Sequence, residues 1–323
     1  MTTKQPFHMT GVDRLRFAVE PFDEACRFAT DWGLAPLRQA ADHAVFQVAD
    51  GGEVEVVRTQ DGVAGSQPVG ARSGLCEVTW GVADQQTLDG LANELSRDRA
   101  VSQDEDGTLH SVDDLGIGLA FRLTRRSKRP CEPTRYNAPG HADRIDRRAA
   151  RYASATPREL SHLAISVDDA GEAAQFYQQR LGFIVSDRYA NRGVFLRCSA
   201  VGNHHDLFLM NGREPGARFN HLAFKVRDVH EVIAGGQHID AQGWTTFAGP
   251  GRHMVSSACF WYFVSPFGGA WEYAADEDMV TEDWVAEDFA AQAHIFSEWT
   301  FGLEKSDGRL RGPIAASREM KAG

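Results

Sequence analysis

Alternating apolar and polar positions divide the chain into repeated units, each opening with a strand and continuing into a helix. In the clearest unit, alternation over 160–167 predicts a strand, and apolar residues at helical spacing from Ala173 to Leu181 predict a helix. Gly182 is expected to end that helix, because glycine is favoured just beyond a helix C-terminus. Three further strands are predicted at 183–186, 193–199 and 206–210.

The same order of elements recurs along the rest of the chain. A second C-terminal unit is predicted from a strand at 220–226, a helix at 229–241 and strands at 244–247, 258–264 and 270–274. The N-terminal half is predicted to contain strands at 12–19, 44–48, 53–58, 76–82, 108–111 and 118–124, with helices at 23–32 and 86–95. Four βαβββ modules follow from this pattern, which predicts an α+β fold with two modules in each half.

Two stretches fall outside the repeats. Residues 125–158 are rich in arginine and lack hydrophobic periodicity, so they are interpreted as a basic linker, with an anion-binding patch as the alternative. They separate an N-terminal domain at 1–124 from a C-terminal domain at 159–280, and a tail follows at 281–323. The aromatic residues of the tail are Trp284, Phe289, Phe296, Trp299 and Phe301. They are expected to pack on the domain surface or a subunit interface, or to cover a site as a lid.

Composition and charge argue against several classes of protein. The chain of 323 residues carries a net charge of −11, which disfavours nucleic acid as a partner. No apolar run approaches the length of a membrane span, and the first residues lead into no apolar signal segment. The five cysteines are scattered without a CxxC pair, so neither a disulfide framework nor a thiolate metal site is expected. A reducing cytoplasm is the expected location.

Three residues near the ends of predicted strands have side chains that bind metals. His162 and His221 each open the first strand of a C-terminal module, and Glu272 lies on the last strand of the final module. A single histidine is more often a surface or core residue than a ligand, but equivalent positions in repeated modules weaken that interpretation. Two imidazoles and one carboxylate can occupy one face of an octahedral metal. The opposite face then stays free for small ligands, as a non-haem Fe(II) oxygenase requires.

The N-terminal half provides an internal comparison. When the modules are aligned, the positions of the three candidate ligands are occupied there by Arg14, Glu77 and Phe121. These side chains do not form a usual ligand set, and eight of the 12 histidines follow residue 158. A single metal site is therefore expected, and it is expected in the C-terminal half.

Five segments of the C-terminal half form an ordered set. They are Ser161-His162-Leu163, Asn203-His204-His205-Asp206-Leu207, Asn220-His221-Leu222-Ala223-Phe224, Gly249-Pro250-Gly251-Arg252-His253, and the run from Phe260 to Tyr273. In order and approximate separation they resemble the type I extradiol ring-cleavage dioxygenases of the vicinal oxygen chelate superfamily. The N-terminal half is similar only in its modular plan. The resemblance implies two domains of paired modules, each an incomplete barrel of mixed sheet with outer helices.

The resemblance also implies a metal, a reaction and partners. It makes His162, His221 and Glu272 the ligands of a mononuclear Fe(II), with Mn(II) as the alternative metal. The implied reaction is cleavage of a catecholic ring by O2, with both oxygen atoms incorporated. The implied partners are the catechol and O2, with no nucleic acid or membrane, and the implied assembly is a homo-oligomer.

Catalytic residues are carried over by position. The resemblance places them at His205, as proton donor on the oxygen side, at Tyr262, as hydrogen-bond donor to the substrate, and at His253, as an aid to substrate deprotonation. Strand alternation directs the neighbouring His204 to the opposite side, where it is expected to be a surface histidine.

Two other functions are compatible with the same fold. A metal-dependent isomerase or lyase of the glyoxalase type needs neither O2 nor the set of His205, His253 and Tyr262. A non-enzymatic binding protein of the superfamily is usually a short two-module chain without the complete set of ligands. The four modules and the full set of candidate residues favour the dioxygenase.

Overall fold

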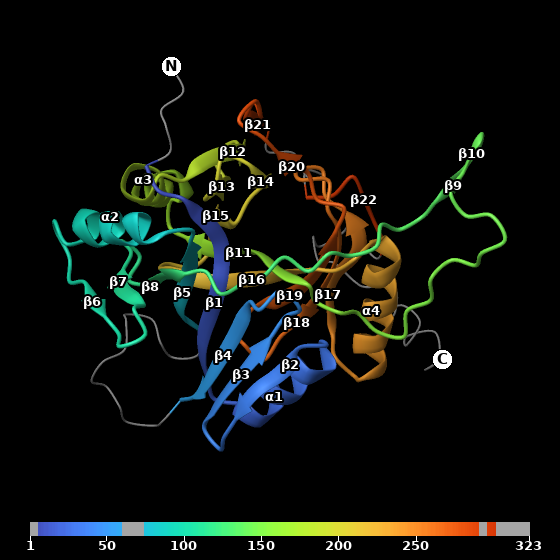
Figure 1. Cartoon of the computed structure of the whole chain (residues 1–323), viewed down its shortest axis with the longest axis horizontal. Helices are drawn as coiled ribbons and strands as arrows, with labels where there is room; N and C mark the ends of the chain where they lie inside the picture. The colour runs from blue at the N-terminus through green and yellow to red at the C-terminus, as the bar shows by residue number, and fades with distance from the viewer. Residues whose placement is uncertain (1–5, 60–73, 291–295, 302–323) are drawn as a thin grey trace.

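The computed structural model describes residues 6–59, 74–290 and 296–301 (Figure 1). The N-terminal half contains an eight-stranded sheet and the C-terminal half a ten-stranded sheet, with helices packed beside them. The predicted α+β class is confirmed. Across these residues, no helix combines the length and apolar character that a membrane crossing would need.

The N-terminal sheet contains both predicted modules of that half. Its elements are β1 (Met9–Val19), α1 (Phe22–Asp31), β2 (Ala35–Gln39), β3 (His43–Gln47), β4 (Glu53–Arg58), β5 (Gly74–Val82), α2 (Gln85–Leu95), β6 (Ser102–Gln103), β7 (Leu109–Val112) and β8 (Gly118–Leu123). The strand order is β2-β3-β4-β1-β5-β8-β7-β6. The sequence pattern does not predict β2 and β6, because both are exposed along their whole length and lack a buried face.

The C-terminal sheet repeats this arrangement and adds two strands from the tail. Its elements are β11 (Glu159–Val167), α3 (Ala170–Leu181), β12 (Ile184–Tyr189), β13 (Gly193–Arg197), β15 (Leu207–Asn211), β16 (Arg218–Lys225), α4 (Val229–Ala241), β17 (Thr246–Arg252), β18 (Cys259–Val264), β19 (Ala270–Ala275), β21 (Glu287–Phe289) and β22 (Trp299–Thr300). The strand order is β21-β12-β13-β15-β11-β16-β19-β18-β17-β22. Helix α4 has the predicted bounds.

The first and last strands of each module pair in parallel. These pairs are β1 with β4, β5 with β8, β11 with β15, and β16 with β19. The two modules of a half are then joined by an antiparallel pair of opening strands, β1 with β5 and β11 with β16. The strand order is linear, so each sheet is open, as an incomplete barrel requires. The opening strands lie at the middle of each sheet, where side chains from both modules can meet.

Helix ends follow local capping chemistry. Asp84, Asp169 and Asp228 precede α2, α3 and α4, and each side chain accepts a backbone N–H from the residue three positions later. Helix α3 ends at Gly182, whose φ of 74° lies in the left-handed region that glycine adopts without strain. The predicted stop signal is therefore confirmed.

The end of helix α1, in the N-terminal half, packs against the C-terminal half. The Trp32 ring stacks on Tyr273 of β19, with ring centroids 3.8 Å apart and planes 15° apart. The Tyr273 hydroxyl donates a hydrogen bond to the Trp32 carbonyl oxygen over 2.7 Å, and the Trp244 indole donates to Asp31 over 2.8 Å. Trp32 and Tyr273 are fully buried, so one hydrophobic core spans both halves.

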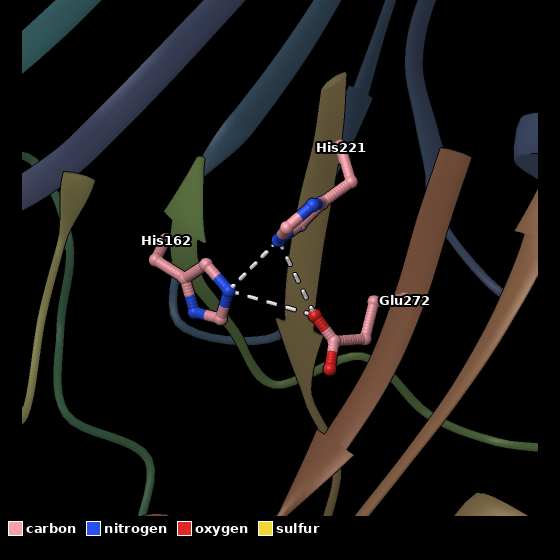
Figure 2. Close-up of side chains that lie close together, drawn as sticks. All are labelled: His162, His221 and Glu272. Carbon is pink, nitrogen blue, oxygen red and sulfur yellow. Dashed lines mark hydrogen bonds and ion pairs between the residues drawn. The ribbon is translucent and has the colours of Figure 1, made fainter. Parts of the chain in front are cut away.

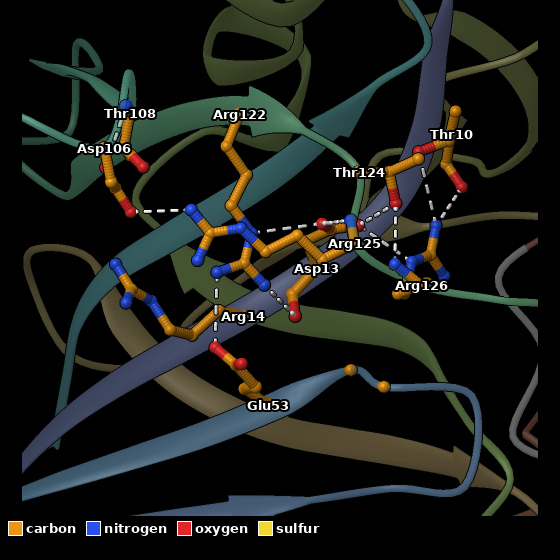
Figure 3. Close-up of polar contacts among 12 residues, drawn as sticks. Thr10, Asp13, Arg14, Glu53, Asp106, Thr108, Arg122, Thr124, Arg125 and Arg126 are labelled. Carbon is orange, nitrogen blue, oxygen red and sulfur yellow. Dashed lines mark hydrogen bonds and ion pairs between the residues drawn. The ribbon is translucent and has the colours of Figure 1, made fainter.

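A buried carboxylate connects β1 to the segment that leaves β8 (Figure 3). Asp13 has no exposed surface and accepts hydrogen bonds from Arg122 over 3.1 Å and from Arg126 over 2.8 Å. Arg122 also donates to Glu53 over 3.2 Å, so the buried charges are paired. Beyond this point the regular elements of residues 127–158 are the short strands β9 (Asn137–Ala138) and β10 (His141–Ala142).

The described part of the tail is built into the C-terminal half. Just before the tail, strand β20 (Met279–Val280) pairs with β14 (Gly202–Asn203). Within the tail, β21 pairs in parallel with β12, and β22 pairs antiparallel with β17. Tail strands therefore extend both edges of the sheet. Residues 302–323 of the predicted tail lie outside the described residues.

Candidate metal centre

Three neighbouring strands bring the predicted ligands together (Figure 2). His162 lies on β11, His221 on β16 and Glu272 on β19, which are consecutive in the sheet. The register pairs Ala223 of β16 with both His162 and Glu272, so these two side chains leave the same face of the sheet. His221 is two residues before Ala223 and therefore shares that face.

The donor atoms of the three side chains converge. His162 Nε2 lies 3.2 Å from His221 Nε2 and 3.5 Å from Glu272 Oε2, and His221 Nε2 lies 3.7 Å from Glu272 Oε2. Within the described ranges, this is the one group of three or more His, Cys, Asp or Glu side chains whose ligand atoms lie within 4.8 Å of one another.

The chemistry of the donors fits a divalent metal. Glu272 has no exposed surface, and neither of its carboxylate oxygens has a well-formed hydrogen bond among the described residues. The nearest basic groups are nitrogens of His162, His221 and His253 at 3.4–3.7 Å. A buried carboxylate in this state is costly unless a cation pairs with it. Imidazole suits iron and carboxylate suits manganese, so the donor set accepts either metal.

The electrostatics favour a positive charge at the same point. Burial opposes the charged form of His162, but Glu272 and Glu277 outweigh burial and raise its pKa to about 9. Burial lowers the pKa of His221 to about 3, which leaves that imidazole neutral. Burial also opposes ionisation of Glu272, yet His162 and His253 hold the pKa of this carboxyl well below its usual range. An ionised carboxylate and a neutral imidazole therefore meet at the centre.

Glu277, behind His162, has no signal in the sequence pattern. Its Oε1 lies 3.4 Å from His162 Nδ1, and Ser161 Oγ donates to its two oxygens over 2.8 and 2.9 Å. Lys225 Nζ lies 3.2 Å from its Oε2. Burial opposes the charge on Glu277, but Lys225 and His162 lower its pKa to about 2. Glu277 is therefore an ionised carboxylate on the side of the His162 ring away from the other ligands.

His253 and Tyr262 lie together beside Glu272. His253 Nε2 is 2.9 Å from the Tyr262 hydroxyl and 3.4 Å from Glu272 Oε1. His253 Nδ1 is 2.8 Å from the carbonyl oxygen of Phe296, which can only accept. In its neutral form, His253 therefore donates a hydrogen bond through Nδ1–H to the Phe296 carbonyl and accepts one at Nε2 from the Tyr262 hydroxyl. The Phe296 ring packs on His253 at a centroid distance of 4.9 Å, so a tail residue covers this edge of the site.

The third predicted catalytic residue, His205, also reaches the centre. Its ring lies beside that of His162, with centroids 4.0 Å apart. Burial lowers the pKa of His205 well below its usual range, and the neighbouring histidines lower it further. The structure thus brings all six predicted residues to one buried place.

The prediction for His204 was wrong. This histidine is 1% exposed, and its Nδ1 lies 3.0 Å from His205 Nδ1 instead of facing solvent. The pair lies between the end of β14 and the start of β15, outside any strand, so strand alternation does not apply to it.

In the N-terminal half, the position equivalent to the His162 ligand is occupied by the positively charged Arg14. Arg14 pairs with Thr79 across β1 and β5, just as His162 pairs with Ala223 across β11 and β16. The Arg14 guanidinium lies 3.8 Å from Glu77. The register corrects one predicted equivalence, because Thr79 pairs with Ala120 and not with Phe121. Phe121 points to the opposite face and is fully buried. In the N-terminal half, Arg14 thus occupies the position of His162, and Ala120 occupies the position of Glu272.

The open sheets and their paired βαβββ modules agree with the fold that the resemblance implies. Residues 159–273 match the family model described as the Glyoxalase/Bleomycin resistance protein/Dioxygenase superfamily. Metapyrocatechase 2 of Cupriavidus necator is 34% identical over 145 residues, which is 44% of this chain and 44% of that protein. The chain is thus aligned with less than half of this relative. These matches confirm the resemblance expected from the sequence.

Two solved structures share the fold over nearly the whole chain. The Mn(II)-bound glyoxalase from Novosphingobium aromaticivorans superposes with a TM-score of 0.73 at 21% identity, covering 96% of this chain and 99% of that one. Homoprotocatechuate 2,3-dioxygenase from Arthrobacter globiformis superposes with a TM-score of 0.71 at 16% identity, covering 94% and 92%. At these identities the likeness shows the fold alone, so the choice between the two chemistries depends on the site.

Proposed function

We propose that the chain is an extradiol dioxygenase that cleaves a catecholic ring with O2 at a mononuclear Fe(II) held by His162, His221 and Glu272. The observation that supports this most strongly is that the ligand set meets His205, His253 and Tyr262 in one buried place. A glyoxalase-type enzyme needs the metal but not these three residues. The relative named metapyrocatechase supports the same choice.

When bound, the metal would hold catechol and O2 side by side and favour loss of a proton from a catechol hydroxyl. His253 is arranged to receive that proton. Its Nδ1–H is directed to the Phe296 carbonyl, so the neutral ring presents the Nε2 lone pair. The Tyr262 hydroxyl, 2.9 Å from this nitrogen, can turn to donate a hydrogen bond to a substrate oxygen.

His205 serves the opposite flank of the site. Its lowered pKa keeps the imidazole neutral, so it can take a proton from one oxygen and return it to another. Phe195 lies edge-on to His205 at a centroid distance of 5.0 Å and stacks on Phe208 at 4.1 Å. These apolar rings exclude water from this flank, which strengthens the hydrogen bonds that His205 makes.

The test is O2 uptake by iron-loaded protein with a panel of mono- and bicyclic catechols. The expected result is O2 consumption with formation of a yellow ring-opened product. No uptake with any catechol of the panel, in protein shown to hold iron, would refute the proposed activity. Parallel loading with Mn(II) tests the choice of metal, because the proposal expects the Fe(II) protein to be the faster enzyme.

The ligand assignment has its own test. His162→Ala and Glu272→Ala are expected to abolish iron retention, measured as iron per chain, because each removes one of three ligands. His110→Ala is the matched control, since it removes a half-buried histidine that pairs with Glu77 in the N-terminal half. Iron per chain that stays unchanged in the ligand variants would refute the assignment.

The second candidate is a metal-dependent isomerase or lyase of the glyoxalase type. It is favoured by one observation, the Mn(II)-bound glyoxalase that shares the fold with a TM-score of 0.73. Turnover under strict anaerobiosis would support it over the dioxygenase. Stoichiometric ligand binding without turnover or metal would instead identify a non-enzymatic binding protein.

A homo-oligomer and a cytoplasmic location stay predictions. The first is tested by the mass of the purified protein in solution. The second rests on the cysteines, none of which forms a disulfide among the described residues; Cys26, Cys198 and Cys259 are buried.

A further inference from the structure

Two buried side chains continue a line of hydrogen bonds from His205 away from the metal centre. His204 Nδ1 lies 3.0 Å from His205 Nδ1, and His204 Nε2 lies 2.7 Å from Asp187 Oδ2. Asp187 is 2% exposed, His204 1% and His205 4%. A buried line of polar groups is costly unless every donor meets an acceptor, so its protons are expected to be ordered.

The order of the protons follows from the carboxylate. An ionised Asp187 can only accept hydrogen bonds, so His204 carries a proton on Nε2 and donates a hydrogen bond from it to the carboxylate. Neutral His204 then has no second N–H, and its Nδ1 must accept from His205. His205 therefore carries its proton on Nδ1, and the Nε2 lone pair is left on the other edge of the ring.

We propose that Asp187 and His204 are positioning residues that fix His205 as the Nδ1–H tautomer and so present its Nε2 lone pair to the substrate. This inference rests on the proposed function for its consequence in turnover. In the proton transfer, an O–H bond of the substrate breaks and an N–H bond forms at Nε2. The same proton later returns from Nε2 to a product oxygen. The Nδ1–H of His205 stays hydrogen-bonded to His204 Nδ1 throughout, so no proton has to travel along the line.

The tail holds the outer end of this line. The backbone N–H of Glu287, on β21, donates to Asp187 Oδ1 over 2.7 Å. The Trp284 ring lies edge-on to His204 at a centroid distance of 5.5 Å, and its indole donates to the Ser186 carbonyl oxygen over 3.0 Å. Ser186 in turn donates from its hydroxyl to the His204 carbonyl oxygen. Both the carboxylate and the ring are thus fixed by hydrogen bonds and packing.

The fixed position of Asp187 makes one substitution especially informative. In Asp187→Asn the Glu287 N–H still requires an acceptor, so the amide oxygen is expected to stay there and the amide NH2 to face His204. His204 Nε2 must then accept a hydrogen bond from this amide, so the ring proton of His204 lies on Nδ1. The His204 Nδ1–H in turn donates a hydrogen bond to His205 Nδ1. The expected result is a reversed line in which His205 presents an N–H at Nε2, where the base should be.

The direct readout is the protonation of the His205 nitrogens. We would record ¹⁵N NMR spectra of the imidazole nitrogens of the full ¹⁵N-histidine-labelled chain loaded with diamagnetic Zn²⁺. The signals of His205 are identified as those that are missing from the spectrum of His205→Gln. The expected result is a proton on Nδ1 in the parent and on Nε2 in Asp187→Asn. A parent His205 protonated only on Nε2 would overturn the inference, and this measurement does not depend on the folding of any Asp187 variant.

Kinetics provide the second readout. Asp187→Asn is expected to lower kcat by about 10- to 100-fold, as loss of a partner behind a functional histidine does, while iron per chain and KM for the catechol stay within about twofold. Asp288→Asn is the matched control, because it neutralises an exposed carboxylate on β21, the strand that pairs with β12, 3.9 Å from Arg188 and outside the line.

The two proposals fail in different ways. If the iron-loaded parent consumes no O2 with any catechol, the proposed function fails while the nitrogen spectra still test the tautomer. If the parent turns over and Asp187→Asn equals it in kcat, the positioning role is wrong and the dioxygenase stands.

Discussion

Glu277 Oε1 lies 3.4 Å from His162 Nδ1, across the imidazole from the nitrogen that faces the other candidate ligands. The chain turns at Asp276, whose φ of 61° is in the left-handed region, and this turn follows directly on β19. A carboxylate at this nitrogen fixes the tautomer and orientation of a metal-binding histidine and increases its basicity.

The first prediction concerns metal affinity. Glu277→Gln should weaken metal binding by about 10- to 100-fold, because an amide supports the His162 ring less well than a carboxylate. The dissociation constant is measured by competition with a coloured chelator. Glu282→Gln, an exposed glutamate of the tail, is the control and should bind as the parent does. Equal constants for parent and Glu277→Gln would show that the carboxylate has no part in binding.

The second prediction concerns pH and the contact between the halves. Asp113, after β7, accepts a hydrogen bond from the Tyr177 hydroxyl of α3 over 2.6 Å, and burial raises its pKa to about 6. The folded state therefore holds this proton more tightly than the unfolded state. The resulting stability is present below the unfolded pKa of 3.8 and is lost as pH rises through about 6.

The measurement is urea unfolding at about pH 5 and pH 8. Between these two pH values the parent should lose roughly 1.4 kcal/mol more of its free energy of unfolding than Asp113→Asn, whose amide does not titrate. Asp114→Asn removes the exposed neighbour that pairs with Arg99, and it should follow the parent. Parallel pH profiles for parent and Asp113→Asn would contradict the raised pKa.

The third prediction concerns the buried charges at the start of the linker. Asp13→Asn should lower the free energy of unfolding by about 3–5 kcal/mol, because it removes the carboxylate that Arg122 and Arg126 share. Urea denaturation measures the change. Asp23→Asn, at an exposed carboxylate that pairs with Arg58, should change it little. Equal losses of unfolding free energy in the two variants would show that the buried ion pairs of Asp13 stabilise the fold no more than the exposed pair of Asp23.

The fourth prediction concerns the shared core. Trp32→Ala should destabilise the chain by about 3–5 kcal/mol and move one cooperative transition that includes both halves, because the ring stacks on Tyr273. Fluorescence and circular dichroism should report the same midpoint. Trp299→Ala, at a residue that is 41% exposed, is the control. Two separate transitions, with only one displaced, would show that the halves unfold independently.

The modular fold and the candidate ligands could be predicted because their signals are local. Each opening strand is marked by an apolar run in the sequence, each helix has a buried stripe, and the repeat places His162 and His221 at equivalent positions. Once the opening strands of two modules pair at the middle of a sheet, residues 59 positions apart necessarily become neighbours. The position of Glu272 on the parallel partner of β16 follows from the same pairing.

The supporting residues could not be predicted because their positions depend on irregular backbone and distant pairing. Glu277 follows a turn with positive φ, and His204 lies between two strands, so neither obeys a period of two residues. The proposed role of Asp187 also depends on β21, a three-residue strand without a hydrophobic pattern, whose Glu287 N–H binds the carboxylate from 100 residues later in the chain. Such contacts are tertiary and leave no periodic trace in the chain.

Strand β21 has a practical consequence for how preparations of this protein are judged. Its backbone and Trp284 hold Asp187 and His204, yet none of the three candidate metal ligands contributes to that pairing. If the tail is clipped or displaced during purification, the metal is expected to stay while the tautomer of His205 is no longer enforced. The amount of metal per chain would then overestimate the fraction of catalytically active molecules. Specific activity should therefore be divided by the fraction of chains with an intact tail, measured by mass spectrometry.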